Sequence, residues 1–312
     1  FQLAKKWEEL FNKTSYYNEI PAKIFFRVLL SSLLKKAEVY KKNGTKLNMV
    51  LHHFIVQTSG SGKDQAFDLL IETCREINTR KPDLIKVYEL SGAESPESLL
   101  DQFATKREKK GEINDYEKII SGILSNHDLI ISRECSFLFV EKRGEKQVKS
   151  ELFLIALEGR PIEKSLKTWQ GHKTITQSNF CFIGTTRPIA NMKQHIVQSG
   201  LQQRAINYMR DVDIDLRIKM MEKVCMHAYG VQNDAVLRRN MIVDFVDELL
   251  EFYDYVQEIG TEITTEEPNE LNKLLYNNIR KILDDINDNL DKEEHKDILG
   301  SFIARLTDIT LV

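Results

Sequence analysis

A short glycine-containing segment between an apolar run and a helical pattern offers the clearest chemistry in the sequence. It reads Gln57-Thr58-Ser59-Gly60-Ser61-Gly62-Lys63-Asp64. Glycines let the backbone curl so that several N–H groups point at one anion, and a following helix adds the positive end of its dipole. Lys63 would then reach the outer phosphates of a nucleotide. We therefore expect a phosphate-binding loop whose nucleotide contacts come from Ser59, Gly60, Ser61, Gly62, Lys63, Asp64 and Gln65.

The loop departs at two positions from the common phosphate-loop pattern G-x-x-x-x-G-K-[ST]. Gln57 stands where the first glycine is usual, and Asp64 replaces the hydroxyl residue that normally contacts Mg²⁺. Gly60, Gly62 and Lys63 keep their register. These departures leave open an alternative, which is an ordinary glycine-containing turn between a strand and a helix.

An acidic residue follows another apolar run farther along the chain. The run 128–132 is short and apolar, as expected for a strand in a sheet buried on both faces. Arg133 and Glu134 follow it directly. In nucleoside triphosphatases, an aspartate that binds the metal usually precedes the glutamate at this place. Arg133 therefore stands where a metal-binding residue is expected. If the bound nucleotide is hydrolysed, we expect Glu134 to orient the water that attacks the terminal phosphate. Asp64 would supply the carboxylate that is missing at position 133, so that Asp64 and Glu134 hold Mg²⁺. A solvated acid at a strand end is the alternative for Glu134.

Two further residues are candidates for contact with the terminal phosphate. Thr186 follows the apolar run 180–184, where a hydroxyl can contact the γ-phosphate or the attacking water. Arg204 precedes the run 205–209 and is placed to reach a neighbouring subunit's nucleotide as an arginine finger, with Arg210 and Arg217 weaker candidates. The predicted catalytic set is Lys63, Glu134, Thr186 and Arg204. A simple strand-to-loop turn and a structural surface arginine are the alternatives.

Apolar runs alternate with helical patterns through the first two thirds of the chain. The expected strands cover 49–56, 84–90, 128–132, 180–184 and 205–209. The expected helices cover a segment opened by Pro21, then 65–77, 96–105, 116–124 and 146–157. This alternation favours an open, mostly parallel α/β sheet that carries its site residues at the carboxyl ends of the strands.

The pattern changes after residue 213, where only helices are expected. They cover 216–229, 235–259, 270–290 and 292–306, whereas residues 1–19 show no clear period. We therefore divide the chain into an N-terminal helical segment (1–48), a P-loop ATPase core (49–217) and a helical C-terminal region (218–312).

The composition is that of a globular protein without a strong charge bias. The chain has 312 residues, of which 42% are hydrophobic and 29% charged, and its net charge is −3. A nucleic-acid contact would therefore need a local basic patch. The apolar run 24–34 is too short to cross a membrane, and the four cysteines form no metal or disulfide pattern. We expect a cytoplasmic protein and, because the chain begins with Phe1, part of a longer one.

The order of these motifs resembles that of AAA+ ATPases over roughly residues 49–220. Within that class, the chain is most similar to the helicase domains of phage and plasmid primase-helicases, a group that includes the viral superfamily 3 helicases. The similar segments are 60–64, Ser91-Gly92 before a helix with Leu99-Leu100, and 133–138.

This resemblance implies a hexameric ring that uses ATP and Mg²⁺ to move along single-stranded DNA as a replicative helicase. It also implies a primase or polymerase domain upstream and a phage- or plasmid-encoded protein in a microbial host. Two alternatives remain. One is a nucleotide-dependent assembly or defence scaffold with little or no hydrolysis, and the other is a different phage DNA motor.

A basic segment lies between the helix 146–157 and the strand 180–184. In ring helicases the corresponding loop points into the central channel, so the resemblance implies that this segment contacts single-stranded DNA. Its cations can follow phosphates and its aromatic residue can stack on a base. The candidate DNA-binding residues are Lys164, Lys167, Trp169, His172 and Lys173. An exposed hairpin with solvated lysines is the alternative.

Overall fold

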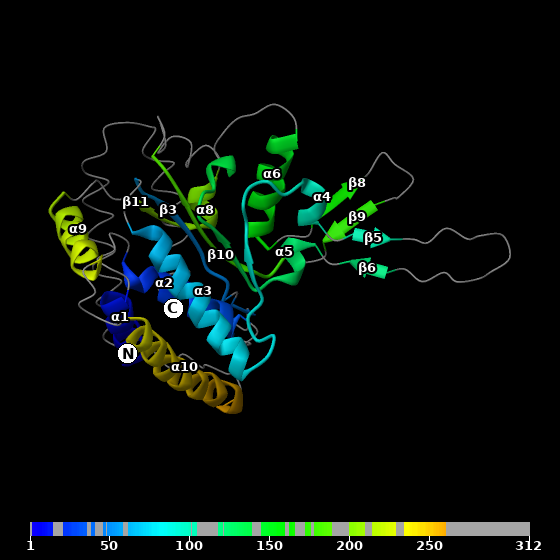
Figure 1. Cartoon of the computed structure of the whole chain (residues 1–312). Helices are drawn as coiled ribbons and strands as arrows, with labels where there is room; N and C mark the ends of the chain where they lie inside the picture. Colours follow the sequence, from blue (N-terminus) through cyan, green and yellow to red (C-terminus); the bar gives the residue numbers. More distant parts are fainter. Residues whose placement is uncertain are drawn as a thin grey trace, which may run out of the picture.

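A five-stranded sheet lies at the centre of the molecule, and all its neighbouring strands are parallel (Figure 1). The strands are β3 (His52–Val56), β4 (Val87–Glu89), β7 (Leu129–Ser132), β10 (Cys181–Thr186) and β11 (Ile206–Met209). Their order across the sheet is β11-β3-β10-β7-β4. The predicted α/β sheet and its five strands are confirmed.

The computed structural model describes most of the first 259 residues of the chain. The described residues are 2–14, 21–35, 39–40, 46–47, 49–58, 62–100, 102–104, 118–120, 122–138, 145–159, 162–165, 172–175, 178–188, 200–209, 214–228 and 234–259.

The three inner strands β3, β10 and β7 are buried along their whole length, because helices cover both faces of the sheet. Successive side chains of a strand point to opposite faces. Ile55 and Ile183 pack with the helices of one face, whereas Phe54 and Phe182 pack with those of the other. This double burial explains why these strands read as nearly continuous apolar runs.

Four helices of the described part of the chain cover the first face. They are α1 (Gln2–Thr14), α2 (Ala22–Leu34), α3 (Lys63–Arg80) and α10 (Asp234–Ile259). The Trp7 side chain is fully buried, its indole nitrogen donates to the carbonyl of Ala22 at 2.8 Å, and its ring lies 5.2 Å from that of Phe245. Helix α1 therefore links the N-terminus to α10, although we assigned no period to residues 1–19.

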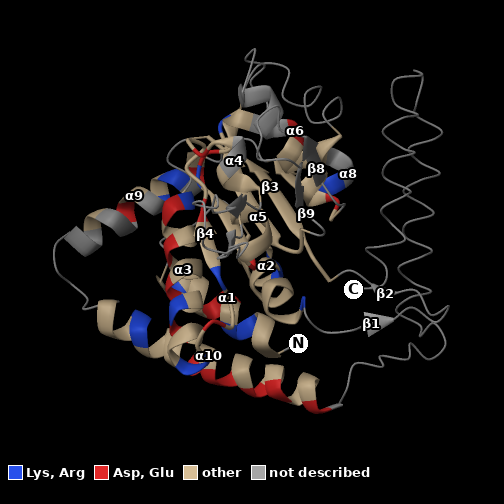
Figure 2. Cartoon of the chain, turned by 90° about the vertical axis from the view of Figure 1, so that its right-hand side faces the viewer, with Lys and Arg blue, Asp and Glu red and all other residues tan. Residues whose placement is uncertain are grey.

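Charged residues also join α10 to this face. Figure 2 shows acidic residues along α10, and two of them, Asp247 and Asp254, form ion pairs with Arg80 and Lys81 at the end of α3. Exposed ion pairs of this kind contribute little to stability. The buried side chain of Phe245 and its apolar neighbours are the stronger attachment.

The second face carries shorter elements around one longer helix. They are α4 (Pro96–Leu99), α5 (Ile123–Asn126), the 3-10 helix η1 (Ser136–Leu138), α6 (Glu145–Leu157) and α8 (Leu201–Arg204). Phe153 of α6 packs edge-on against Phe182 of β10, with ring centroids 5.0 Å apart. Aromatic contacts of this geometry add to the hydrophobic burial that holds α6 on the sheet.

Two predicted helices are wrong, because part of each forms a strand instead. Strand β5 (Gln102–Ala104) pairs antiparallel with β6 (Lys118–Ile120), within the segments 96–105 and 116–124 that we expected to be helical. Pairing between the two segments outweighs their local helical pattern. Gly122 permits this approach, since a Cβ there would lie 2.1 Å from the carbonyl oxygen of Leu100.

Two further hairpins lie outside the main sheet. Strand β1 (Val39–Tyr40) pairs with β2 (Lys46–Leu47), and β8 (Ile162–Ser165) pairs with β9 (His172–Ile175), both antiparallel. The β8–β9 hairpin follows α6 and lies next to it. It contains part of the basic segment identified in the sequence.

The predicted C-terminal helices are confirmed as far as the described residues extend. Helix α9 (Ile214–Ala228) and α10 match the helices expected at 216–229 and 235–259. The helices expected at 270–290 and 292–306 lie outside the described residues. Among the helices that the structure describes, none has the length and apolar character needed to cross a bilayer.

Candidate functional site

The candidate site lies at the carboxyl edge of the sheet, where β3, β10 and β7 end side by side. The backbone N–H of Gln57 donates to the carbonyl of Thr186 at 2.9 Å, and that of Cys135 donates to Thr185 at 2.8 Å. These bonds continue the sheet beyond its last paired residues. They bring the segments that follow three strands to one place, as ligand sites in open α/β sheets require.

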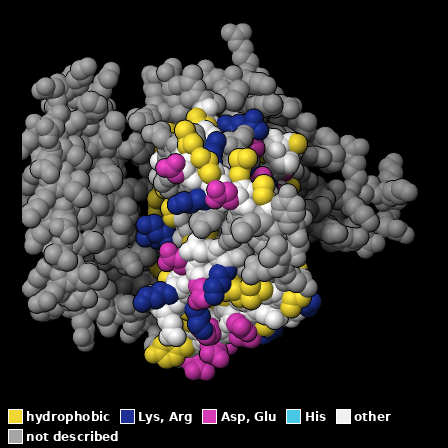
Figure 3. All heavy atoms as spheres, turned by 60° about the vertical axis from the view of Figure 1, so that its left-hand side comes forward, with side chains coloured by type: hydrophobic (Ala, Val, Ile, Leu, Met, Phe, Trp, Pro, Cys, Tyr) yellow, Lys and Arg dark blue, Asp and Glu magenta, His cyan; other side chains and the backbone are white. Residues whose placement is uncertain are grey.

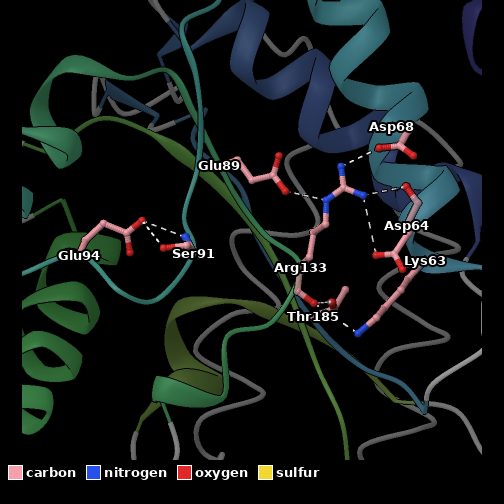
Figure 4. A network of polar contacts seen from close by, with 8 residues as sticks. All are labelled: Lys63, Asp64, Asp68, Glu89, Ser91, Glu94, Arg133 and Thr185. Atoms are coloured by element: carbon pink, nitrogen blue, oxygen red, sulfur yellow. Dashed lines mark hydrogen bonds and ion pairs between the residues drawn. The ribbon is translucent and has the colours of Figure 1, made fainter.

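The glycine-containing loop connects β3 to α3 at this edge. Gly62 has φ 78°, which favours glycine, and α3 begins at Lys63. The Lys63 Nζ donates to the backbone carbonyl of Arg133 at 3.3 Å (Figure 4). The predicted contact residues Ser59, Gly60 and Ser61 lie outside the described residues. The strand–loop–helix context required for a phosphate loop is therefore present, with its lysine facing β7.

Glu134 and Thr186 are in direct contact, as their roles would require. The Thr186 hydroxyl donates to Glu134 Oε1 at 2.8 Å, and the backbone N–H of Ser136 donates to the same oxygen at 3.2 Å. In addition, the Thr185 hydroxyl donates to the Arg133 carbonyl at 2.5 Å, the group that also accepts from Lys63. The structure thus brings together three of the four predicted catalytic residues.

Arg133 is the most highly connected side chain of this edge. Its Nε donates to Glu89 of β4 at 2.6 Å, and its Nη2 donates to Asp68 of α3 at 2.6 Å. Its Nη1 donates to the backbone carbonyl of Asp64 at 3.3 Å and lies 3.8 Å from the Asp64 carboxylate (Figure 4). The ring of Phe67 lies 5.9 Å from the guanidinium carbon.

The charge of Arg133 is secured by these acidic partners. Partial burial alone would lower the pKa of the guanidinium, but hydrogen bonds to Asp68 and Glu89 outweigh it and raise the pKa above the ordinary value. Sequence reasoning did not identify Asp68 or Glu89 as site residues. Their signal was present only indirectly, because a basic residue beside a helix N-terminus needs acidic partners.

The Asp64–Glu134 pair does not fit the Mg²⁺ that the loop pattern implies. The carboxylate of Asp64 faces the Arg133 guanidinium, and one oxygen of Glu134 accepts two hydrogen bonds from protein groups. The Arg133 guanidinium, 3.8 Å from the Asp64 carboxylate, therefore competes with any cation for that carboxylate. Within the described part of the chain, no three His, Cys, Asp or Glu side chains are grouped to hold a metal.

Arg204 lies at the opposite edge of the sheet from the glycine-containing loop. It precedes β11, whose first residue, Ile206, is level with His53, three residues before the end of β3. Its Nη1 donates to the Gly200 carbonyl at 3.0 Å, and its Nη2 forms an ion pair with Glu158. The structure therefore does not bring Arg204 to the Lys63 site of its own chain.

Arg217 provides a contact with the loop that sequence reasoning had assigned to a different role. It lies on α9, and its Nη2 donates to the hydroxyl of Thr58, the last described residue before the glycines. The arginine thus adds positive charge near the glycine-containing loop from within the same chain. Its spacing after β11 was the available signal, but its direction was not readable from the sequence.

The basic segment is only partly described. Lys164 and Lys173 are directly opposite each other in the β8–β9 pair, and His172 is opposite Ser165. Lys167 and Trp169 lie between the two strands, outside the described residues. Elsewhere, basic and acidic side chains are interspersed on the face shown in Figure 3.

Comparison with protein-family models finds no match for this chain, and comparison with curated proteins likewise finds none.

Proposed function

We propose that the carboxyl edge of the sheet is a P-loop-type site for a nucleoside triphosphate and that the chain is an ATP-hydrolysing motor. The contact between Glu134 and Thr186 next to the Lys63 loop carries this proposal. A simple glycine turn needs neither an acid nor a hydroxyl on the neighbouring strand ends. Thr186 lies on β10, Glu134 follows β7 and the Lys63 loop follows β3, and these three strands are neighbours in parallel register.

Binding follows from the charges and backbone groups at the start of α3. The first N–H groups of a helix have no partners within it, and its dipole places roughly half a positive charge at this end. Lys63 adds a full positive charge that can contact the outer phosphates. Arg217 adds a second through its contact with Thr58. An anionic phosphate chain is the ligand that this arrangement favours.

Hydrolysis would depend on Glu134 and Thr186 acting together. Glu134 accepts a proton from the attacking water, while the Thr186 hydroxyl fixes the carboxylate and orients the water toward the terminal phosphate. Their 2.8 Å hydrogen bond preorganises the carboxylate before substrate arrives. No step in this scheme is assigned to a metal ion, because the residues at this corner do not fit one.

Replacing the carboxylate of Glu134 by an amide tests hydrolysis directly. Glu134→Gln can keep the hydrogen bond from Thr186 but cannot take a proton, so we expect ATP turnover to fall by about 10²–10⁴-fold while ATP binding remains. Initial rates of phosphate release, with nucleotide affinity measured in parallel, check this expectation. Glu94→Gln is the matched control, since Glu94 is also near a strand end but accepts from Ser91. Equal turnover in both variants would rule out Glu134 as the base.

A second part of the proposal concerns single-stranded DNA. The register of the β8–β9 hairpin places Lys164 opposite Lys173. In a chain whose net charge is −3, a phosphate backbone needs such a local group of basic residues. We therefore assign DNA binding to this hairpin, and motor action on single-stranded DNA in a ring oligomer to the chain.

One specific observation favours a different function. The Asp64–Arg133 contact occupies the corner where a metal is usual in an efficient nucleotide hydrolase. A nucleotide-dependent assembly switch, which binds ATP but turns it over slowly or not at all, would tolerate that exchange. Saturable ATP binding without DNA-stimulated turnover would favour the switch over the motor.

A further inference from the structure

Two departures from the phosphate-loop pattern meet in space. Asp64 replaces the hydroxyl residue after the loop lysine, and Arg133 replaces the acid before Glu134. The two positions are 69 residues apart in the sequence, yet Arg133 donates to the Asp64 carbonyl and its guanidinium faces the Asp64 carboxylate at 3.8 Å. The residue that replaces the usual hydroxyl thus contacts the residue that replaces the usual acid.

In nucleotide hydrolases of this kind, the corresponding hydroxyl and acid hold Mg²⁺, which neutralises charge on the outer phosphates. In this chain a guanidinium stands at that corner instead, where it is paired with Asp68 and Glu89 and lies 3.8 Å from the Asp64 carboxylate. Arginine does not lose its proton in proteins and is a preferred partner of phosphate groups. Lys63, one residue before Asp64, supplies a second positive charge.

We propose that the Asp64–Arg133 pair replaces the metal-ligand pair, so that this loop binds nucleotide without requiring a divalent cation. The proposal rests on the proposed nucleotide site and deepens it. It assigns the place of the metal at the loop to Arg133. Asp64 pairs with the guanidinium and is therefore not free to bind a cation.

The surroundings of Arg133 are suited to this role. Glu89 and Asp68 contact the guanidinium from two different elements, β4 and α3, and orient it next to the loop. The Phe67 ring supports it from α3. The side chain nevertheless remains 28% exposed, so its charge can act on a ligand at the edge.

A purely structural role for Arg133 would be to fasten α3 to the edge of the sheet. Loss of that role would lower stability, but it would not change how nucleotide affinity depends on Mg²⁺. The metal dependence of binding therefore separates the two roles.

The test is a titration of the full chain with a fluorescent ATP analogue, once in excess EDTA and once in excess MgCl₂. We expect the two dissociation constants to agree within about threefold, whereas an affinity roughly tenfold or more higher with Mg²⁺ would overturn the proposal. Absence of binding in both conditions would instead refute the proposed nucleotide site itself, and the inference with it.

A double exchange restores the usual residue types at both positions. For Asp64→Ser combined with Arg133→Asp, we expect affinity in EDTA to fall by about tenfold or more and to be recovered by Mg²⁺. Continued metal independence of this folded variant would overturn the role of Arg133. Thermal unfolding of the variant establishes that it is folded.

Two further variants keep the test decisive if the double variant does not fold. Arg133→Lys retains the charge and should remain metal-independent, so an affinity about tenfold or more higher with Mg²⁺ in this variant would overturn charge replacement. Arg80→Ala is the matched control, because it removes an arginine–carboxylate pair at the far end of α3. That end lies about 25 Å from the loop for an 18-residue helix, and Arg80→Ala should leave both dissociation constants unchanged.

Discussion

At the scale of single residues, the site combines groups whose positions could be read from the sequence with groups whose partners could not. Glu134 and Thr186 each follow an apolar run, and parallel strands place such residues together. A contact between the two side chains could therefore be expected from the sequence. The partners of Arg133 were not, because Asp68 lies on a helix and Glu89 on the edge strand, and only the packing of α3 against β4 and β7 brings them together.

His53, a residue of strand β3, leads to a prediction about how the stability of the protein depends on pH. It is buried in β3, and neither of its ring nitrogens has a hydrogen-bond partner among the described residues. Burial, with a smaller contribution from the charge of Arg27, lowers the pKa of His53 from 6.5 to about 4. The folded protein therefore keeps this imidazole neutral where the unfolded chain would protonate it.

Stability should consequently fall as the pH drops from the unfolded pKa of His53 toward its folded one. Between about pH 7 and pH 5 we expect this residue to cost about 2 kcal/mol in the free energy of unfolding. Urea denaturation at both pH values measures it, and His53→Leu should remove most of this component. An unchanged pH dependence in that variant would show that His53 is not the responsible group.

At the scale of helices and strands, apolar runs predicted the sheet well and local pattern predicted its insertions poorly. Every expected strand was found, since inner strands buried on both faces give unambiguous apolar runs. Segments 96–105 and 116–124 were expected to be helical, but they contain the β5–β6 pair, whose stability comes from pairing across the hairpin. Helix α1 was missed, although Leu3, Trp7 and Leu10 have helical spacing and are buried.

The β8–β9 hairpin is the element that makes the DNA proposal testable. We expect Lys164→Ala combined with Lys173→Ala to weaken binding of single-stranded DNA and to lower the slope of log affinity against log salt by about 1.4, for two lost phosphate contacts. Fluorescence anisotropy at several salt concentrations measures both quantities. Lys5→Ala combined with Lys23→Ala, two exposed lysines of α1 and α2, is the matched control. Equal slopes in both variants would place the DNA site elsewhere.

At the scale of the whole molecule, the two ends of the parallel strands carry different candidate residues. The carboxyl edge carries Lys63, Glu134 and Thr186, whereas Arg204 lies toward the amino edge in an ion pair with Glu158. A chain cannot use its own Arg204 at its own loop. If the residue acts as an arginine finger, it must leave Glu158 and reach the nucleotide of a neighbouring copy.

This geometry predicts that nucleotide promotes assembly. We expect the sedimentation coefficient of the chain to rise from that of a monomer to that of a ring oligomer when ATP is added, because an incoming Arg204 would be stabilised by the bound phosphates. Arg204→Ala should reduce this ATP-dependent shift. A monomer under every nucleotide condition would contradict the role assigned to Arg204.

The central claim is that the loop before α3 binds a nucleoside triphosphate through Lys63, and calorimetric titration of the chain with ATP tests it most directly. The account predicts saturable binding that Lys63→Ala weakens by at least about tenfold. Lys81→Ala, at the opposite end of α3 and paired with Asp254, should bind ATP as the unchanged chain does. Equal ATP affinity in the Lys63 and Lys81 variants, or no binding to the unchanged chain, would contradict the claim.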